Sequence, residues 1–84
     1  LKPAIEAYTE GDYPLARVRF DTLSQKYPAS IEARFYQGVT LMLIGDYAAA
    51  VPPLEAAAAI GDPQFGDDVA RYLALARQRA ASGR

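Results

Sequence analysis

The sequence has no cysteine and no histidine among its 84 residues. Without cysteine there are no disulfides or thiolate nucleophiles, and without histidine the serines lack the base that activates most catalytic hydroxyls. The usual zinc ligands are missing as well. The carboxylates are scattered along the chain, and no glycine-rich stretch forms a phosphate-binding loop. We therefore expect a protein that is not an enzyme and binds no cofactor or metal.

An excess of charge of one sign is also missing. Nine Lys and Arg residues oppose ten Asp and Glu residues, for a formal net charge of -1. Proteins that bind nucleic acid usually carry a clear basic excess, so we expect no nucleic-acid partner. With 51% hydrophobic and 23% charged residues, the composition is that of one small globular domain.

Long hydrophobic runs are absent from the sequence, which has nothing close to the ~20 apolar residues that span a bilayer. We expect no membrane insertion within this segment. The chain opens with Leu1 rather than Met, which leaves open whether it is a piece of a longer protein; if it is, any leader or anchor would lie outside this segment. The compartment stays open between cytoplasm and periplasm.

The sequence does contain an internal repeat. The tripeptide Gly11-Asp12-Tyr13 recurs 34 residues later as Gly45-Asp46-Tyr47, and further apolar positions follow each copy at the same spacing. A period of this length is typical of stacked helical units. The repeat-defining positions are Gly11, Tyr13, Ala16, Phe20 and Pro28 in the first copy and Gly38, Gly45, Tyr47, Ala50 and Ala57 in the second.

Five helices are predicted from local chemistry. Gly11 and Gly45 can adopt positive φ and end a helix, and the aspartate after each can cap the next one. No stretch alternates with period two, and the connections are short, so neighbouring helices should run antiparallel. The predicted ranges are 3–10, 13–26, 30–44, 47–60 and 67–81.

Pro52 and Pro53 fall inside the fourth predicted helix. The apolar pattern continues past them, so we expect the helix to survive with a kink or a loosened first turn. The alternative is a helix that starts only at Pro53.

The 34-residue period and the Gly-Asp-Tyr-x-x-Ala core resemble the tetratricopeptide repeat (TPR) in its bacterial form. The stretch Phe35-Tyr36-Gln37-Gly38 looks like a first-helix signature of that family, and Tyr72 follows Tyr36 by 36 residues as the start of a further copy. The sequence departs from the family at Arg34, where a bulky residue is usual, and at Gln37, where Leu is usual.

The resemblance implies an all-α fold in which antiparallel helix pairs stack as a right-handed α-solenoid. It assigns 1–84 to a single domain, with a partial first repeat at about 1–28 and a second repeat at about 30–62. The remainder, about 66–82, would be a partial repeat or a capping helix.

The resemblance further implies that the first helix of each pair lines a concave face. Such a face, apolar here, would make the chain a scaffold that binds a partner peptide or helix. The groove positions implied in this way are Ile5, Tyr8, Thr9, Phe35, Val39, Met42, Leu75 and Gln78.

Several alternatives remain open at this stage. Phe35, Val39 and Met42 could simply be core, and the tyrosines could be packing residues with wet hydroxyls. The chain could also be a structural or oligomerisation segment of a larger bacterial envelope or regulatory protein, and a homo-oligomer is possible. The last helix could offer a basic face, although arginine there is also favoured by the helix dipole. Its arginines are Arg71, Arg77, Arg79 and Arg84.

Overall fold

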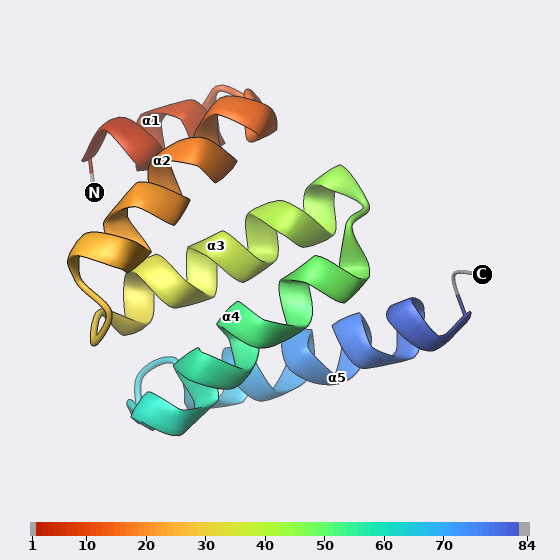
Figure 1. The fold of residues 1–84 in the computed structure, drawn as a ribbon. Helices are drawn as coiled ribbons and strands as arrows, with labels where there is room; N and C mark the ends of the chain where they lie inside the picture. Colours follow the sequence, from red (N-terminus) through yellow and green to blue (C-terminus); the bar gives the residue numbers. More distant parts are fainter. Residues whose placement is uncertain (1, 83–84) are drawn as a thin grey trace.

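A computed structural model describes residues 2–82, and five α-helices account for most of them. No strand occurs within that range, so the all-α prediction is confirmed. In chain order the helices are α1 (Lys2–Thr9), α2 (Tyr13–Lys26), α3 (Ile31–Ile44), α4 (Tyr47–Ile60) and α5 (Gly66–Ser82) (Figure 1). Each predicted range overlaps one of these helices almost completely.

The helix ends follow the chemistry of the repeated tripeptide. Gly45 closes α3 with φ 94°, a left-handed conformation that favours glycine. At the start of α2 the carboxylate of Asp12 accepts from the N–H of Leu15 at 3.3 Å. At the start of α4, Asp46 accepts from the N–H of Ala49 at 3.4 Å. The same cap geometry at both copies explains why the tripeptide recurs.

Helix α4 runs unbroken through its two prolines. The alternative in which the helix starts at Pro53 is therefore wrong. Pro53 is buried and Pro52 is exposed. Neither residue has a backbone N–H, so the carbonyls one turn earlier, at Ala48 and Ala49, lose their helical donors.

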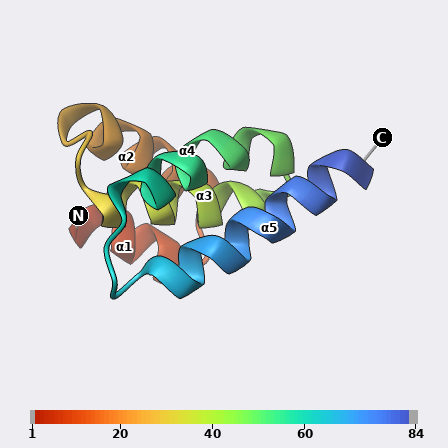
Figure 2. The ribbon, with the colours of Figure 1, turned by 90° about the horizontal axis from the view of Figure 1, so that it is seen from below.

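The helices alternate in direction along the chain, and α3 lies in the middle of the molecule (Figure 1). It contacts α2, α4 and α5. Viewed from below, α2 and α4 lie along one side and α1 and α5 along the other (Figure 2). Helix α3 lies between these two pairs (Figure 2), and ring contacts join it to α1 and to α5.

Two groups of buried side chains hold the helices together. One joins α3, α4 and α5, and the other joins α1 and α2. Tyr8 and Tyr36 pack against both groups, so they connect the two halves of the core.

The repeat-defining spacing corresponds to the closest packing. Ala16, Phe20, Ala50 and Ala57 are fully buried at 0% exposure. Gly38 packs so tightly against α4 that a Cβ there would lie 2.5 Å from Cγ of Leu54. The shared small and apolar positions are therefore the points at which helices touch.

None of the helices described over residues 2–82 combines the length and the apolar character needed to cross a membrane.

Candidate protein-binding surface

Six aromatic residues form a continuous chain of ring contacts across α1, α2, α3, α5 and the loop before α5. We call this set the aromatic ladder. Its members are Tyr8, Tyr13, Phe35, Tyr36, Phe65 and Tyr72.

The ladder runs from ring to ring at short centroid distances. Tyr8 lies 5.9 Å from Tyr13 and 5.6 Å from Tyr36. Tyr36 lies 5.3 Å from Phe35, whose ring is in turn 5.7 Å from that of Tyr72. All four of these pairs meet edge to face, the arrangement favoured by the aromatic quadrupole. The rings therefore stabilise one another and fix the relative positions of α1, α3 and α5.

Phe65 joins the ladder from the loop between α4 and α5, with its ring 5.7 Å from that of Phe35. A tight turn places it. The carboxylate of Asp62 accepts from the N–H of Gln64 at 2.7 Å, and the Asp62 carbonyl accepts from the N–H of Phe65 at 3.2 Å. This Asx-type turn directs the loop back over α3.

The ladder is partly open to solvent. Phe35 is buried, with 7% of its surface exposed, but the other five rings are half-buried. No hydrogen bond to a residue within 2–82 engages the hydroxyls of Tyr8, Tyr13, Tyr36 or Tyr72, and none of these oxygens is enclosed. Their O–H groups therefore remain available as donors or acceptors.

Tyr8 lies at the centre of the four phenols. Burial of its ring raises the pKa of the Tyr8 hydroxyl above 10.0, and the neighbouring phenols of Tyr72, Tyr13 and Tyr36 raise it further. At neutral pH the Tyr8 hydroxyl is consequently a neutral donor.

The eight predicted groove residues differ in how deeply they are buried. Phe35, Val39 and Met42 are buried, with exposures of 7%, 4% and 9%, and belong to the core shared by α3, α4 and α5. Only Tyr8 and Phe35 of the predicted residues belong to the ladder. The remaining positions lie around it: Ile5 and Leu75 are half-buried, and Thr9 and Gln78 are exposed.

Four ladder residues were not among the predicted groove positions: Tyr13, Tyr36, Phe65 and Tyr72. One signal was present, because Tyr72 follows Tyr36 by 36 residues, close to the repeat distance of 34 residues. No sequence signal marks Phe65, whose position depends on a loop turn.

The arginines of α5 do not form a free basic face within the described residues. Arg71 pairs with Asp68, and Arg77 lies 3.0 Å from the carboxylate of Glu55 on α4. The guanidinium of Arg79 lies over the ring of Tyr47, 5.5 Å from its centroid, a cation–π contact. Arg84, the fourth arginine of the sequence prediction, lies outside the described residues.

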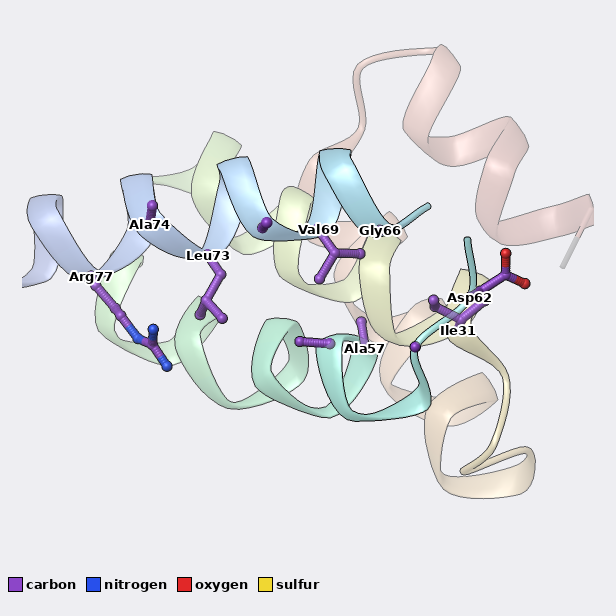
Figure 3. Close-up of a pocket in the computed structure, with 11 residues that line it drawn as sticks. Ile31, Ala57, Asp62, Gly66, Val69, Leu73, Ala74 and Arg77 are labelled. Atoms are coloured by element: carbon purple, nitrogen blue, oxygen red, sulfur yellow. The ribbon is translucent and has the colours of Figure 1, made fainter. Parts of the chain in front are cut away.

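A cavity of about 270 Å³ lies between α4 and α5, away from the ladder (Figure 3). Val69 and Leu73 point from α5 toward α4, where Ala57 faces them, and Arg77 reaches down at one end (Figure 3). The lining is mainly apolar, and α4 contributes the small side chains of Ala57 and Ala58. It can take an apolar side chain, and Asp62 and Arg77 are the charged residues of its lining.

Within residues 2–82 no group of three acidic, histidine or cysteine side chains is placed to hold a metal ion. Comparison with protein-family models, with curated proteins and with solved structures gave no match.

Proposed function

We propose that the chain is a TPR-type protein-binding module that holds a segment of a partner protein on the face of its aromatic ladder. In this proposal α1, α3 and α5 are the first helices of successive pairs in a right-handed α-solenoid. The 34-residue repeat, the matching caps at Asp12 and Asp46, and the alternating helix directions support it. An array of this kind offers the side formed by its first helices to a partner.

The observation that carries the proposal is the half-buried state of five ladder rings, four of which carry a hydroxyl with no hydrogen-bond partner among residues 2–82. Tyrosine and phenylalanine are enriched in protein interfaces because a rigid ring supplies a large contact area at a low cost in side-chain entropy. Phe35, Val39 and Met42 then serve as the buried base beneath the contact surface. Ile5, Thr9, Leu75 and Gln78 form its surroundings on the same helices.

Selection of displayed random peptides tests this function. The wild-type chain is expected to enrich peptides that bind with saturable affinity. Tyr72→Glu introduces a charge into the ladder and is expected to abolish that binding, since a carboxylate there would have to be desolvated by the partner. The matched control is Tyr27→Glu, at a tyrosine that is 52% exposed and lies outside the ladder.

Circular dichroism must first show that both variants keep the helical content of the wild type. Peptides that bind the wild type and Tyr27→Glu but not Tyr72→Glu support the proposal. Failure to enrich any peptide, or equal binding by Tyr72→Glu, contradicts it.

A further inference from the structure

We propose that the cavity between α4 and α5 is part of a dimer interface, in which α5 packs antiparallel against α5 of a second copy of this chain. The cavity is the one of about 270 Å³ shown in Figure 3. Its lining includes Ala70 and Ala74, each two positions from Tyr72. Residues two apart point in nearly opposite directions on an α-helix, so this side of α5 faces away from the ring of Tyr72. The dimer therefore goes beyond the proposed function and leaves the ladder accessible.

The outer side of the cavity is uncovered. Ala58 on α4 and Ala70 and Ala74 on α5 line the cavity, yet all three are exposed. Ala74 follows Gly38 by 36 residues, the same interval that separates the two tyrosines of α3 and α5 in the ladder. At Gly38, α3 is covered by α4 through Leu54. The corresponding position on α5 has no helix over it among residues 2–82.

The charges at the two ends of the cavity have opposite sign. Arg77 lines one end and Asp62 lines the other (Figure 3). Asp67 follows Gly66 on the acidic side, is exposed and makes no ion pair with a residue in the range 2–82. A surface with one positive and one negative end is complementary to a copy of itself turned by 180°. This complementarity favours a two-fold dimer over a partner of one charge.

The sequence of α5 matches an antiparallel pair position by position. Asp67 and Arg77 lie five positions on either side of Tyr72, and steps of three and four residues keep both on the face that carries the two alanines. Ala70 and Ala74 lie two positions on either side of Tyr72. When two α5 helices cross at the level of Tyr72, Asp67 of each copy faces Arg77 of the other. At the centre, Ala70 faces Ala74.

These residues suit a close helix contact. Alanine side chains allow two helices to approach to about 8 Å, the short end of the range for packed helices. Arg77 donates one N–H to Glu55 at 3.0 Å and has further N–H groups for a second carboxylate. The interface thus has an apolar centre and two equivalent ion pairs at its rim, as protein interfaces commonly do.

The other exposed apolar side chains do not offer such a match. Val18 on α2 is 59% exposed and lines a cavity between α1 and α2, where Arg19 is the one charged residue of the described lining. Lys26 is likewise the one charged residue lining the cavity between α2 and α3. Two copies of either face would bring like charges together. Within residues 2–82, four further large apolar side chains are exposed but line none of these three cavities: Leu15, Leu43, Ile44 and Ile60.

Sedimentation equilibrium of the 84-residue chain tests the dimer. The average mass of the wild type should rise toward twice that of one chain between about 1 μM and about 1 mM. Ala74→Glu places a carboxylate at the centre of the interface and should raise the dissociation constant of the dimer by about tenfold or more. Ala59→Glu adds the same charge at an exposed alanine of α4 outside the cavity lining and should leave the constant unchanged. Circular dichroism must show that both variants keep the helical content of the wild type.

Charge reversal tests the antiparallel arrangement. Asp67→Arg sets two arginines against each other at both ends of the dimer, and Arg77→Glu sets two carboxylates there. Each variant alone should therefore associate about tenfold more weakly than the wild type. An equimolar mixture of the two variants restores a pair of opposite charges at both ends. The mixture should associate about tenfold more tightly than either variant alone.

Three results would overturn the proposal. A wild-type chain that stays monomeric at about 1 mM would leave this face to a helix of another protein. Association of Ala74→Glu that equals that of the wild type, or equal weakening by Ala59→Glu, would show that the cavity is not the interface. A mixture that associates no better than its two components would contradict the antiparallel pairing of α5. The display selection on the ladder is read separately, so the dimer and the proposed function can fail independently.

Discussion

At the scale of single residues, Gly38 sets the distance between α3 and α4. A Cβ at this position would lie 2.5 Å and 2.7 Å from two carbon atoms of the fully buried Leu54. We expect Gly38→Ala to lower the free energy of unfolding by about 1 kcal/mol. Overpacking costs about 2 kcal/mol, which outweighs a gain of about 1 kcal/mol in helix propensity. Urea unfolding followed by circular dichroism measures the change.

Gly66 provides the matched control for this substitution. It is also helical, but a Cβ there would meet no heavy atom within 4 Å. Gly66→Ala should therefore be neutral or raise the free energy of unfolding by about 0.5 kcal/mol. A Gly38→Ala variant that is as stable as Gly66→Ala would show that α3 and α4 do not pack as tightly as described.

At the scale of elements, a polar bridge ties α2 to α3. The hydroxyl of Ser24 donates to the side-chain carbonyl of Gln37 at 2.9 Å, and the Gln37 amide donates to Asp21 at 2.8 Å. Ser24 is only 1% exposed. The bridge therefore satisfies a buried hydroxyl at the contact between the two helices.

The bridge predicts a non-additive pair of substitutions. Gln37→Leu leaves the buried Ser24 hydroxyl without its partner and should lower the free energy of unfolding by about 1–3 kcal/mol. Ser24→Ala combined with Gln37→Leu removes both polar groups and should recover most of that loss. A double-mutant cycle in urea measures the coupling, expected at about 1 kcal/mol. Additive effects would mean that the hydroxyl finds another acceptor.

Pro52 lies within α4 with its side chain exposed. Pro52→Ala restores a backbone N–H that can donate to the carbonyl of Ala48. We expect a gain of about 1–2 kcal/mol in the free energy of unfolding, since interior proline costs about 3 kcal/mol and the greater freedom of the unfolded chain returns part of it. Thermal and urea unfolding both report the gain.

Pro14 is the control for that substitution, because it occupies the first turn of α2, where no helical acceptor is lost. Pro14→Ala should change the free energy of unfolding by no more than about 0.5 kcal/mol. Equal stabilisation by both substitutions would mean that the position of the proline within its helix has no effect.

The helices could be predicted from the sequence because their ends are decided locally. Gly45 needs only its own backbone freedom, and Asp12 and Asp46 need only the N–H groups three residues later. The effect of the Pro52-Pro53 pair on α4 is harder to predict. Burial of Pro53 in the core favours the helix, whereas the loss of a backbone N–H donor disfavours it. The sequence alone is consequently compatible with two starting positions for α4.

At the scale of the whole molecule, the candidate surface was only partly predictable. Tyr8 and Phe35 are among the groove positions predicted from the sequence, but the burial of Phe35 depends on its contacts with Phe65 and Tyr72. Those two residues reach Phe35 from 30 and 37 positions further along the chain. Such contacts follow from how helices cross, and periodicity within one helix carries no information about them.

Tyr8 tests the whole assembly because it packs against both halves of the core. Its folded-state pKa is raised above 10.0 by burial and by the nearby phenols, so the folded chain holds this proton more tightly than the unfolded chain does.

The stabilisation that depends on the proton of the Tyr8 hydroxyl is complete below about pH 10 and is lost as pH rises through the folded-state pKa. We therefore expect the urea midpoint to fall as the pH rises above about 10, and to fall less steeply in Tyr8→Phe, which has no proton to release. Every other titrating group is present in both proteins, so the difference between their pH profiles reports the Tyr8 hydroxyl and its interaction with the neighbouring phenols. Identical profiles would mean that the Tyr8 ring is fully hydrated, and that α1 does not pack against α3 through the ladder.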